Sequence, residues 1–196
     1  MKLNLPNIIT VARIIITPVF LAVFLMDSLP NRFLIACIIF TIASISDAVD
    51  GYLARKNNQV TNFGKFLDPI ADKVLTTSAL LAFMSMGLCN IWIVMIVLTR
   101  EFAIASVRMI AATNGVVIPA NIWGKIKTIS QMVFTILIML LGEAYYIVEK
   151  LNIDLFAKLP DLSLISNGLL WVTAILTVIS GWIYLNDSKK IIDFIK

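Results

Sequence analysis

Four of the nine aspartates, Asp47, Asp50, Asp68 and Asp72, lie within 26 residues. They form two pairs whose members are three or four residues apart, so each pair should share one face of a helix. Clustered carboxylates repel one another and need a cation. All-oxygen ligation favours a hard divalent ion, Mg²⁺ first and Mn²⁺ second. Four carboxylates can hold two such ions, an arrangement used for displacement at phosphorus.

Small residues accompany both aspartate pairs. Gly51 and Ala54 continue the helix face of the first pair, and Gly64 lies one turn before the second pair. A bulky ligand can approach a helix backbone only where side chains are small, so these positions fit a binding site. The structural alternative is that the aspartates pair with Lys or Arg side chains or cap helices.

The composition predicts a membrane protein. Of the 196 residues, 60% are apolar and 14% charged, and the mean hydropathy is +0.94; a soluble domain carries roughly 25% charged residues. Disordered, collagen-like and ordinary soluble proteins are therefore excluded. The chain has no histidine, which excludes Ser/His and Cys/His catalysis and His-ligated metals. Its net charge of +4 is typical of basic cytoplasmic loops, so we expect no nucleic-acid partner.

Six apolar stretches are long enough, at about 20 residues each, to cross the hydrocarbon core as helices. We therefore expect an all-α integral membrane protein with six transmembrane helices and a single domain over 1–196. The predicted spans are 8–26, 33–53, 66–86, 91–112, 124–147 and 165–185. Small residues on the fourth span suit close helix packing or a homodimer interface.

Basic residues predict the orientation. Twelve Lys or Arg residues fall at the ends assigned to the cytoplasm and three in the outer loops, so we expect both termini to be cytoplasmic. Residues 1–7 should lie along the inner surface. The aspartates then lie about 3–9 Å inside the cytoplasmic ends of the second and third spans. This depth predicts one cavity open to the cytoplasm. We also expect a multi-pass protein of a bacterial plasma membrane.

The complete pattern around the aspartates resembles the signature of a known family, the CDP-alcohol phosphotransferases. The signature reads D-x2-D-G-x2-A-R-x8-G-x3-D-x3-D, and the chain meets it at all eight positions. These are Asp47, Asp50, Gly51, Ala54, Arg55, Gly64, Asp68 and Asp72. Members of the family are six-span membrane enzymes that join a CDP-linked donor to an alcohol and release CMP.

The resemblance implies roles for these residues. The four aspartates would ligate a pair of Mg²⁺ or Mn²⁺ ions, and Asp72 would also be the base for the attacking hydroxyl. The residues implied in the donor's nucleotide site are Asp47, Gly51, Ala54, Arg55 and Gly64.

Three further segments are similar to the phosphatidylglycerophosphate synthases of that family. They are 5–13 (LPNIITVAR), 99–101 (TRE) and 124–131 (GKIKTISQ). The similarity implies CDP-diacylglycerol as the donor and sn-glycerol 3-phosphate as the acceptor.

An anionic acceptor needs cations outside the metal pair. Arg108, Lys125 and Lys127 lie at the predicted depth of the aspartates and are candidates for its phosphate. Lys125 and Lys127 point about 200° apart on a regular helix, so one of them can face away from the site. For both lysines the alternative role is anchoring of the helix at the inner membrane surface. Arg100 is a fourth candidate, about 18 Å deep, with pairing to Glu101 as its alternative role.

Two other functions fit parts of the pattern. A sibling enzyme with serine, inositol phosphate or phosphatidylglycerol as acceptor would share the aspartates, but a neutral acceptor would leave the cations without an anion. A small cation transporter would also use intramembrane carboxylates. It predicts inverted repeats and carboxylates near the midplane, and the sequence has neither feature.

Overall fold

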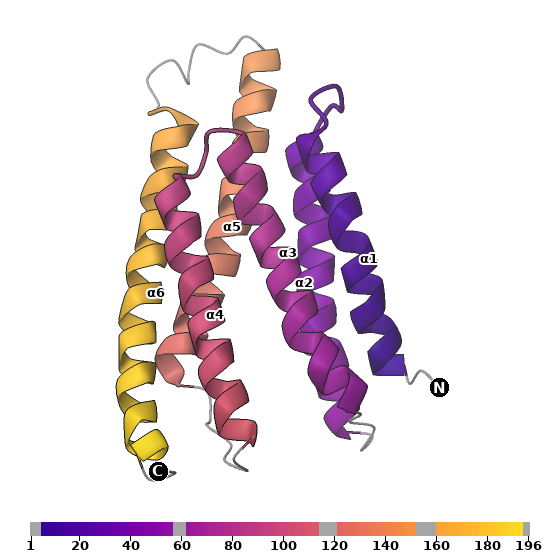
Figure 1. Ribbon diagram of the computed structural model, residues 1–196. Helices are drawn as coiled ribbons and strands as arrows, with labels where there is room; N and C mark the ends of the chain where they lie inside the picture. The colour runs from indigo at the N-terminus through magenta and orange to yellow at the C-terminus, as the bar shows by residue number, and fades with distance from the viewer. Residues whose placement is uncertain (1–4, 57–61, 114–120, 152–159, 194–196) are drawn as a thin grey trace.

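Six α-helices make up the described part of the chain, residues 5–56, 62–113, 121–151 and 160–193 of a computed structural model (Figure 1). They are α1 (Leu5–Leu25), α2 (Arg32–Lys56), α3 (Asn62–Ser85), α4 (Ile91–Thr113), α5 (Ile122–Lys150) and α6 (Leu162–Asp193). Each helix overlaps one predicted span, which confirms the all-helical prediction. The ends of α1 to α5 lie within four residues of the predicted ends, whereas α6 continues eight residues beyond its predicted end at 185. Of the segment predicted to lie along the inner surface, residues 5–7 already belong to α1, and residues 1–4 lie outside the described residues.

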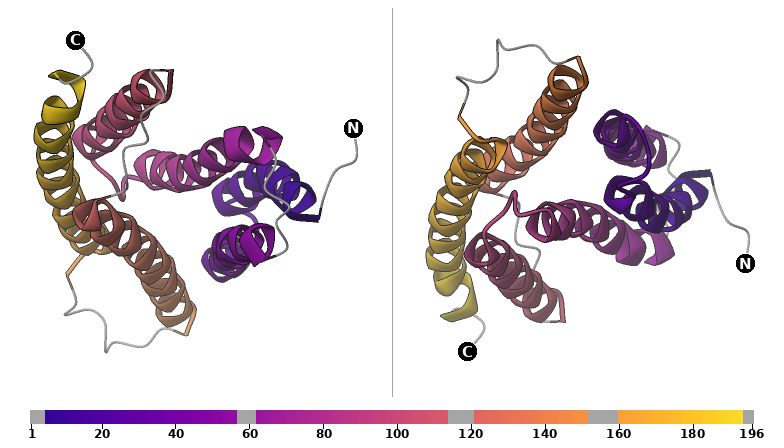
Figure 2. Two further views of the ribbon diagram at one scale, coloured as in Figure 1. Left: turned by 90° about the horizontal axis from the view of Figure 1, so that it is seen from below. Right: turned by 90° about the horizontal axis from the view of Figure 1, so that it is seen from above.

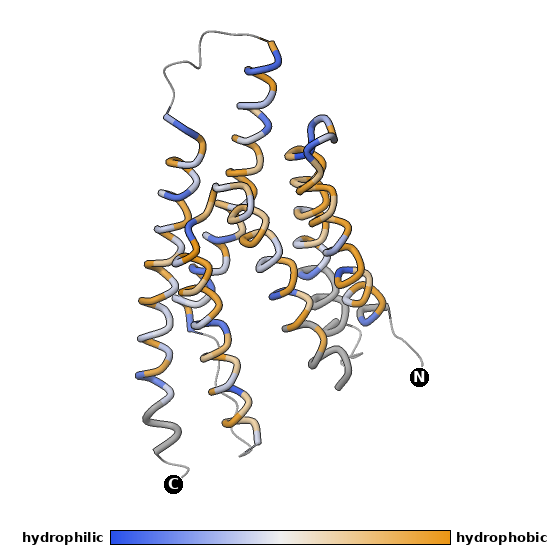
Figure 3. The backbone as a smooth tube through the Cα atoms, turned by 45° about the horizontal axis from the view of Figure 1, so that its top comes forward, coloured by the Kyte–Doolittle hydropathy of each residue, from blue (hydrophilic) through white to orange (hydrophobic). Residues whose placement is uncertain are grey.

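Of the six predicted spans, three are helices whose described residues are long and apolar enough to cross a membrane. The stretches are Asn7–Leu25, Ile122–Lys150 and Leu162–Ser188. Large apolar side chains such as Ile15, Met109 and Trp182 are exposed on the outside of the bundle. Apolar positions run along most of each helix (Figure 3). An outer surface this apolar is explained by contact with lipid, since a soluble monomer rarely exposes so much of it.

The helices that carry the aspartates are both packed on α1. α1 contacts α2 and α3 extensively, whereas the described residues of α2 and α3 touch each other over a short stretch only. The short connection between the two aspartate-bearing helices in the sequence favours packing as close antiparallel neighbours, but contact with α1 replaces most of that interface among the described residues. On the other side of the bundle α4 and α5 pack on α6, and α5 also contacts α2 (Figure 2). The beginning of α1 and the end of α6 lie at the same end of the bundle (Figure 1).

Phenylalanines fill the core between α1, α2 and α3. Phe20, Phe24, Phe40 and Phe83 are fully buried. The ring centroids of Phe24 and Phe83 are 5.6 Å apart in an edge-to-face arrangement, and those of Phe20 and Phe40 are 5.8 Å apart. Ring pairs of this kind stabilise packing beyond the apolar area that they bury. They fix α2 and α3 relative to α1, and so they determine where the aspartates of those helices lie.

Glu143 of α5 binds the first turn of α2. Its carboxylate accepts hydrogen bonds from the backbone N–H of Leu34 (3.0 Å) and from Nδ2 of Asn31 (2.6 Å). A carboxylate is stabilised there because the first N–H groups of a helix have no partner within the helix. The neighbouring Gly142 lies against Phe33, whose ring atoms would be 2.5 Å from a Cβ at that position. α5 and α2 are therefore joined closely at this point.

Candidate active site

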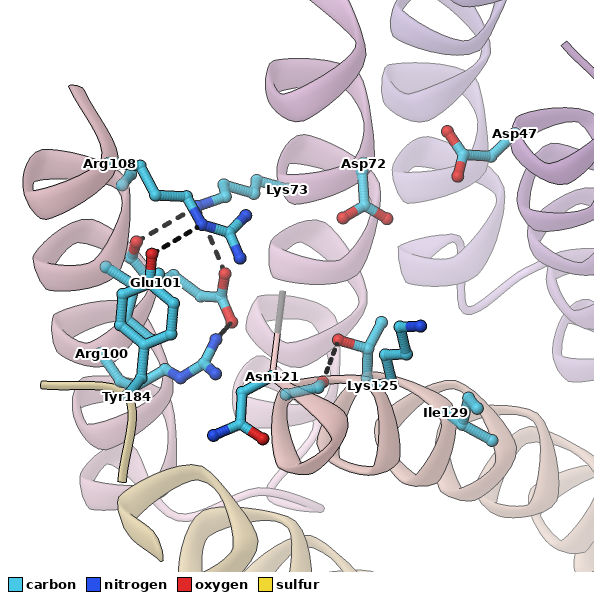
Figure 4. Close-up of a pocket in the computed structure, with 14 residues that line it drawn as sticks. Asp47, Asp72, Lys73, Arg100, Glu101, Arg108, Asn121, Lys125, Ile129 and Tyr184 are labelled. Atoms are coloured by element: carbon cyan, nitrogen blue, oxygen red, sulfur yellow. Dashed lines mark hydrogen bonds and ion pairs between the residues drawn. The ribbon is translucent and has the colours of Figure 1, made fainter. Parts of the chain in front are cut away.

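A cavity of about 680 Å³ opens between α2, α3, α4, α5 and α6. Its charged lining residues are Asp47, Asp72, Lys73, Arg100, Glu101, Arg108 and Lys125. Figure 4 shows the two aspartates, from α2 and α3, on one side of the cavity and the two arginines, from α4, on the other. The cavity thus places two carboxylates opposite two guanidinium groups, an arrangement that can hold a cation on one side and an anion on the other.

Asp47 is held by a residue from a third helix. Arg13 of α1 donates hydrogen bonds from Nη1 to the Asp47 carboxylate and from Nε to the Ser46 hydroxyl at 3.4 Å. The Arg13 side chain is 1% exposed and that of Asp47 38% exposed. One end of the ion pair is therefore buried in the protein, while the Asp47 carboxylate reaches the cavity. In the sequence, Arg13 is one of the basic residues at the cytoplasmic ends and closes the segment 5–13, but no role at the aspartates follows from it.

Asp72 faces the same cavity from α3. Its side chain is half-buried, and no hydrogen bond or ion pair to its carboxylate occurs among the described residues. Asp72 therefore has both oxygens available to a ligand or a proton within the described part of the protein.

Carboxylate oxygens of this kind are suitable ligands for Mg²⁺ or Mn²⁺. Two of the four predicted metal ligands, Asp47 and Asp72, line one cavity. Asp50 and Asp68 lie on the same helices, but their side chains are outside the described residues. Within the described residues, no three acidic or cysteine side chains come together as a metal site. The donor chemistry fits a divalent ion, and the four-aspartate site stays a prediction.

The other signature residues are also outside the described side chains. Gly51, Ala54 and Arg55 continue α2, and Gly64 lies in the first turn of α3. Their role in a nucleotide site stays a prediction as well.

Glu101 is the centre of an ionic cluster that the sequence analysis missed. Its carboxylate accepts from Nζ of Lys127 at 2.6 Å and from Nη1 of Arg100 at 3.0 Å, and it lies 3.3 Å from Nζ of Lys73. The three cations come from α3, α4 and α5, so the cluster connects three walls of the cavity. Only the Arg100–Glu101 pair had been considered, because the other two partners are distant in sequence.

The four predicted acceptor-binding residues do not occupy equivalent places. Arg100, Arg108 and Lys125 line the cavity. Arg100 reaches it although it lies deep in its helix, because the cavity itself extends that far. Lys127 is 2% exposed and bonded to Glu101, beside a second space of only about 30 Å³. The two lysines thus face different surroundings, as their spacing on the helix suggested.

A polar face of α6 supports the arginines. Ser180 accepts from Nη2 of Arg100 at 3.1 Å, and the Tyr184 hydroxyl accepts from Nε of Arg108 at 3.1 Å. Thr173 and Thr177 extend the same buried face. Their spacing of three or four residues was visible in the sequence, but small polar residues at that spacing are equally typical of helix packing.

Comparisons with known proteins agree on one family. A family model described as CDP-alcohol phosphatidyltransferase matches residues 3–180. The chain is 40% identical to the CDP-diacylglycerol–glycerol-3-phosphate 3-phosphatidyltransferase of Bacillus subtilis (strain 168), over 94% of this chain and 95% of the relative. It is 36% identical to the protein of the same name from Rickettsia bellii, over 95% and 96% of the two chains. A probable phosphatidylglycerophosphate synthase of Mycobacterium tuberculosis is 40% identical over 66% of this chain and 63% of the relative.

Proposed function

Because the chain belongs to the CDP-alcohol phosphatidyltransferase family, we propose that it transfers the phosphatidyl group of CDP-diacylglycerol to sn-glycerol 3-phosphate. The products are phosphatidylglycerophosphate and CMP. The observation that carries this proposal is the cavity in which Asp47 and Asp72 face Arg100, Arg108 and Lys125. The names of the relatives that cover nearly the whole chain support the same donor and acceptor.

In the proposed reaction the 1-hydroxyl of the acceptor attacks the phosphorus that carries the diacylglycerol. The new bond joins the acceptor oxygen to that phosphorus, and the bond between that phosphorus and the oxygen of CMP breaks. Asp72 takes the proton of the attacking hydroxyl as general base. Its carboxylate suits this role because it lines the cavity and has no hydrogen-bond partner among the described residues.

Asp47, Asp50, Asp68 and Asp72 are the residues that would hold Mg²⁺ or Mn²⁺. Such ions supply charge neutralisation at the diphosphate and at the leaving CMP. Arg13 keeps the Asp47 carboxylate at the cavity wall. Gly51, Ala54, Arg55 and Gly64 would leave room for the nucleotide and contact it.

The acceptor's phosphate binds between Arg108, Lys125 and Arg100. Arginine forks and lysine ammonium groups bind phosphate through charge-assisted hydrogen bonds. Lys127 acts in a different way, because its side chain is buried and does not line the main cavity. It supports the acceptor site through the Glu101 cluster.

All six helices cross the plasma membrane of a bacterium in this proposal, with both termini and the cavity on the cytoplasmic side. The start of α1 and the end of α6 at one end of the bundle support an even number of crossings. The excess of basic residues at the proposed inner ends supports the orientation. Donor acyl chains would stay in the bilayer while the headgroup enters the cavity.

The proposal is tested with purified enzyme in detergent, Mg²⁺ and CDP-diacylglycerol labelled in the cytidine. CMP release is measured with sn-glycerol 3-phosphate, serine, inositol phosphate or phosphatidylglycerol as the acceptor, and the lipid product is identified. We expect release with glycerol 3-phosphate alone and its loss with a chelator. Release with another acceptor only would make the protein a sibling enzyme, and release that survives strong chelation would exclude the metal site.

A further inference from the structure

Both arginines of the cavity are held by one turn of α6. Arg108 donates from Nε to the Tyr184 hydroxyl at 3.1 Å, and its guanidinium carbon lies 5.3 Å from the centre of the Tyr184 ring. Arg100 donates from Nη2 to the Ser180 hydroxyl at 3.1 Å. Ser180 and Tyr184 are four residues apart and share one face of α6. Residues 180–184 are called the 180–184 turn below.

The two supporting hydroxyls are themselves fixed in place. Tyr184 is 3% exposed and Ser180 is 1% exposed, so neither side chain can move freely. Ser180 also donates to the backbone carbonyl of Thr177 at 3.1 Å. Its proton is directed to that carbonyl, and its oxygen lone pairs are left for Arg100. The 180–184 turn is therefore a preorganised acceptor of hydrogen bonds from both arginines.

Two glycines leave room for the Arg100 side chain. A Cβ on Gly181 would lie 3.1 Å from Cγ of Arg100, and a Cβ on Gly124 of α5 would lie 3.3 Å from its Nη2. Both distances are shorter than an ordinary van der Waals contact between a Cβ and a side-chain carbon or nitrogen. The Arg100 side chain thus lies between α5 and α6, and a larger residue in place of Gly124 or Gly181 would crowd it.

The bond to Tyr184 decides which part of Arg108 faces the cavity. This hydrogen bond uses Nε of Arg108, and the two terminal nitrogens of Arg108 make no hydrogen bond to another described residue. Those nitrogens carry four N–H donors in a planar fork, and Arg108 lines the cavity. A fork of this kind matches two oxygens of a phosphate, whereas a neutral alcohol offers it no anion.

We propose that the 180–184 turn of α6 positions Arg108 and Arg100 for the acceptor's phosphate and thereby sets the selectivity for a phosphorylated acceptor. This inference rests on the proposed function and assigns Tyr184 and Ser180 as positioning residues of that site. A purely structural role of the turn would predict that its variants lose stability and affect donor and acceptor alike. A positioning role predicts that KM for the acceptor changes alone.

The test compares Tyr184→Phe and Ser180→Ala with wild type in steady-state assays of purified enzyme. Each variant removes one hydroxyl and keeps the helix. We expect KM for glycerol 3-phosphate to rise about tenfold in each, with kcat and KM for CDP-diacylglycerol within about twofold. Tyr145→Phe is the matched control, because that hydroxyl donates to the Pro160 carbonyl, outside the cavity. Its KM values should equal those of wild type.

A double variant separates the role of Tyr184 from general damage. In an Arg108→Lys background Nε is absent, so adding Tyr184→Phe should raise the acceptor KM no further. If Tyr184→Phe fails to fold, the acceptor KM of Ser180→Ala alone tests the role of the turn. Unchanged acceptor KM in the folded variants, or an equal rise for the donor, contradicts the role of the turn. A wild-type enzyme that releases no CMP with glycerol 3-phosphate contradicts the proposed function instead.

Discussion

The guanidinium of Arg13 on α1 is buried against the carboxylate of Asp47 on α2. This ion pair connects two segments that are separate in the sequence, the opening 5–13 and the aspartate pattern. Thr10 and Thr17 are buried on the same side of α1, one turn on either side of Arg13. The first helix therefore has a defined task at the site, which is to present Asp47 to the cavity at a fixed position.

Replacing Arg13 by Ala should destabilise the protein and reduce activity. The variant removes a charged hydrogen bond to Asp47 and leaves a space where a side chain 1% exposed had packed. We expect the free energy of unfolding to fall by about 1–3 kcal/mol, seen as a lower Tm in detergent, and the Mg²⁺ dependence of turnover to change. Arg32→Ala is the control, since Arg32 pairs with the exposed Asp27 and such pairs contribute about 0–1 kcal/mol. Equal Tm values for both variants would contradict the assignment.

Asp72→Asn should abolish turnover while leaving the fold and donor binding largely intact. The amide has nearly the same size but is not a base, so kcat should fall by about 10²–10⁴. Turnover is measured as CMP release, and donor binding by equilibrium binding of labelled CDP-diacylglycerol. The control is Asp27→Asn, which removes a carboxylate that is 90% exposed and outside the cavity lining. Full activity in Asp72→Asn would refute its role as the base.

Periodicity and length were enough to predict the six helices, because each apolar stretch matches the thickness of a bilayer. The placement of Asp47 and Asp72 on one cavity also agrees with the spacing of the pattern. The contact of α2 and α3 with α1 was not predictable, since it depends on how Phe20, Phe24 and Phe83 pack in three dimensions. A hydropathy pattern does not specify which apolar faces meet.

The acceptor side of the cavity was predicted less completely. Arg108 and Lys125 were identified from charge and depth, and both line the cavity. The contacts of Lys127 with Glu101 and of Arg108 with Tyr184 were missed, because they join residues 26 and 76 positions apart. Contacts between such distant residues depend on how each helix is rotated about its axis. Packing determines that rotation, and the spacing of residues in the sequence does not.

Lys125 and Lys127 should respond differently to replacement by Ala. Lys125 is exposed on the cavity wall, so its loss should raise the acceptor KM about tenfold with little change in Tm. Lys127 is buried and forms an ion pair with Glu101, so its loss should lower the free energy of unfolding by about 3 kcal/mol. Steady-state kinetics and thermal unfolding distinguish the two. A raised acceptor KM with unchanged Tm in Lys127→Ala would show that Lys127 contacts the phosphate directly.

Gly142→Ala should destabilise the protein at the junction of α5 and α2. The new Cβ would lie 2.5 Å from the Phe33 ring, and Phe33 in turn packs edge-on against Phe24 with centroids 5.4 Å apart. Relieving this clash requires the Phe33 ring to shift from its contact with Phe24, so we expect the free energy of unfolding to fall by about 1–3 kcal/mol, measured as a lower Tm in detergent.

Gly168→Ala is the matched control for Gly142→Ala. Gly168 lies within α6, and a Cβ there would meet no atom within 4 Å. Ala is about 0.8–1 kcal/mol more favourable than Gly inside a helix, so this variant should keep or raise the Tm. Because the Phe33 contact lies far along α5 from Lys125, Gly142→Ala should leave KM for both substrates unchanged in the folded enzyme. Equal Tm values for the two glycine variants would mean that Phe33 can move aside, and that α2 is not held tightly against α5.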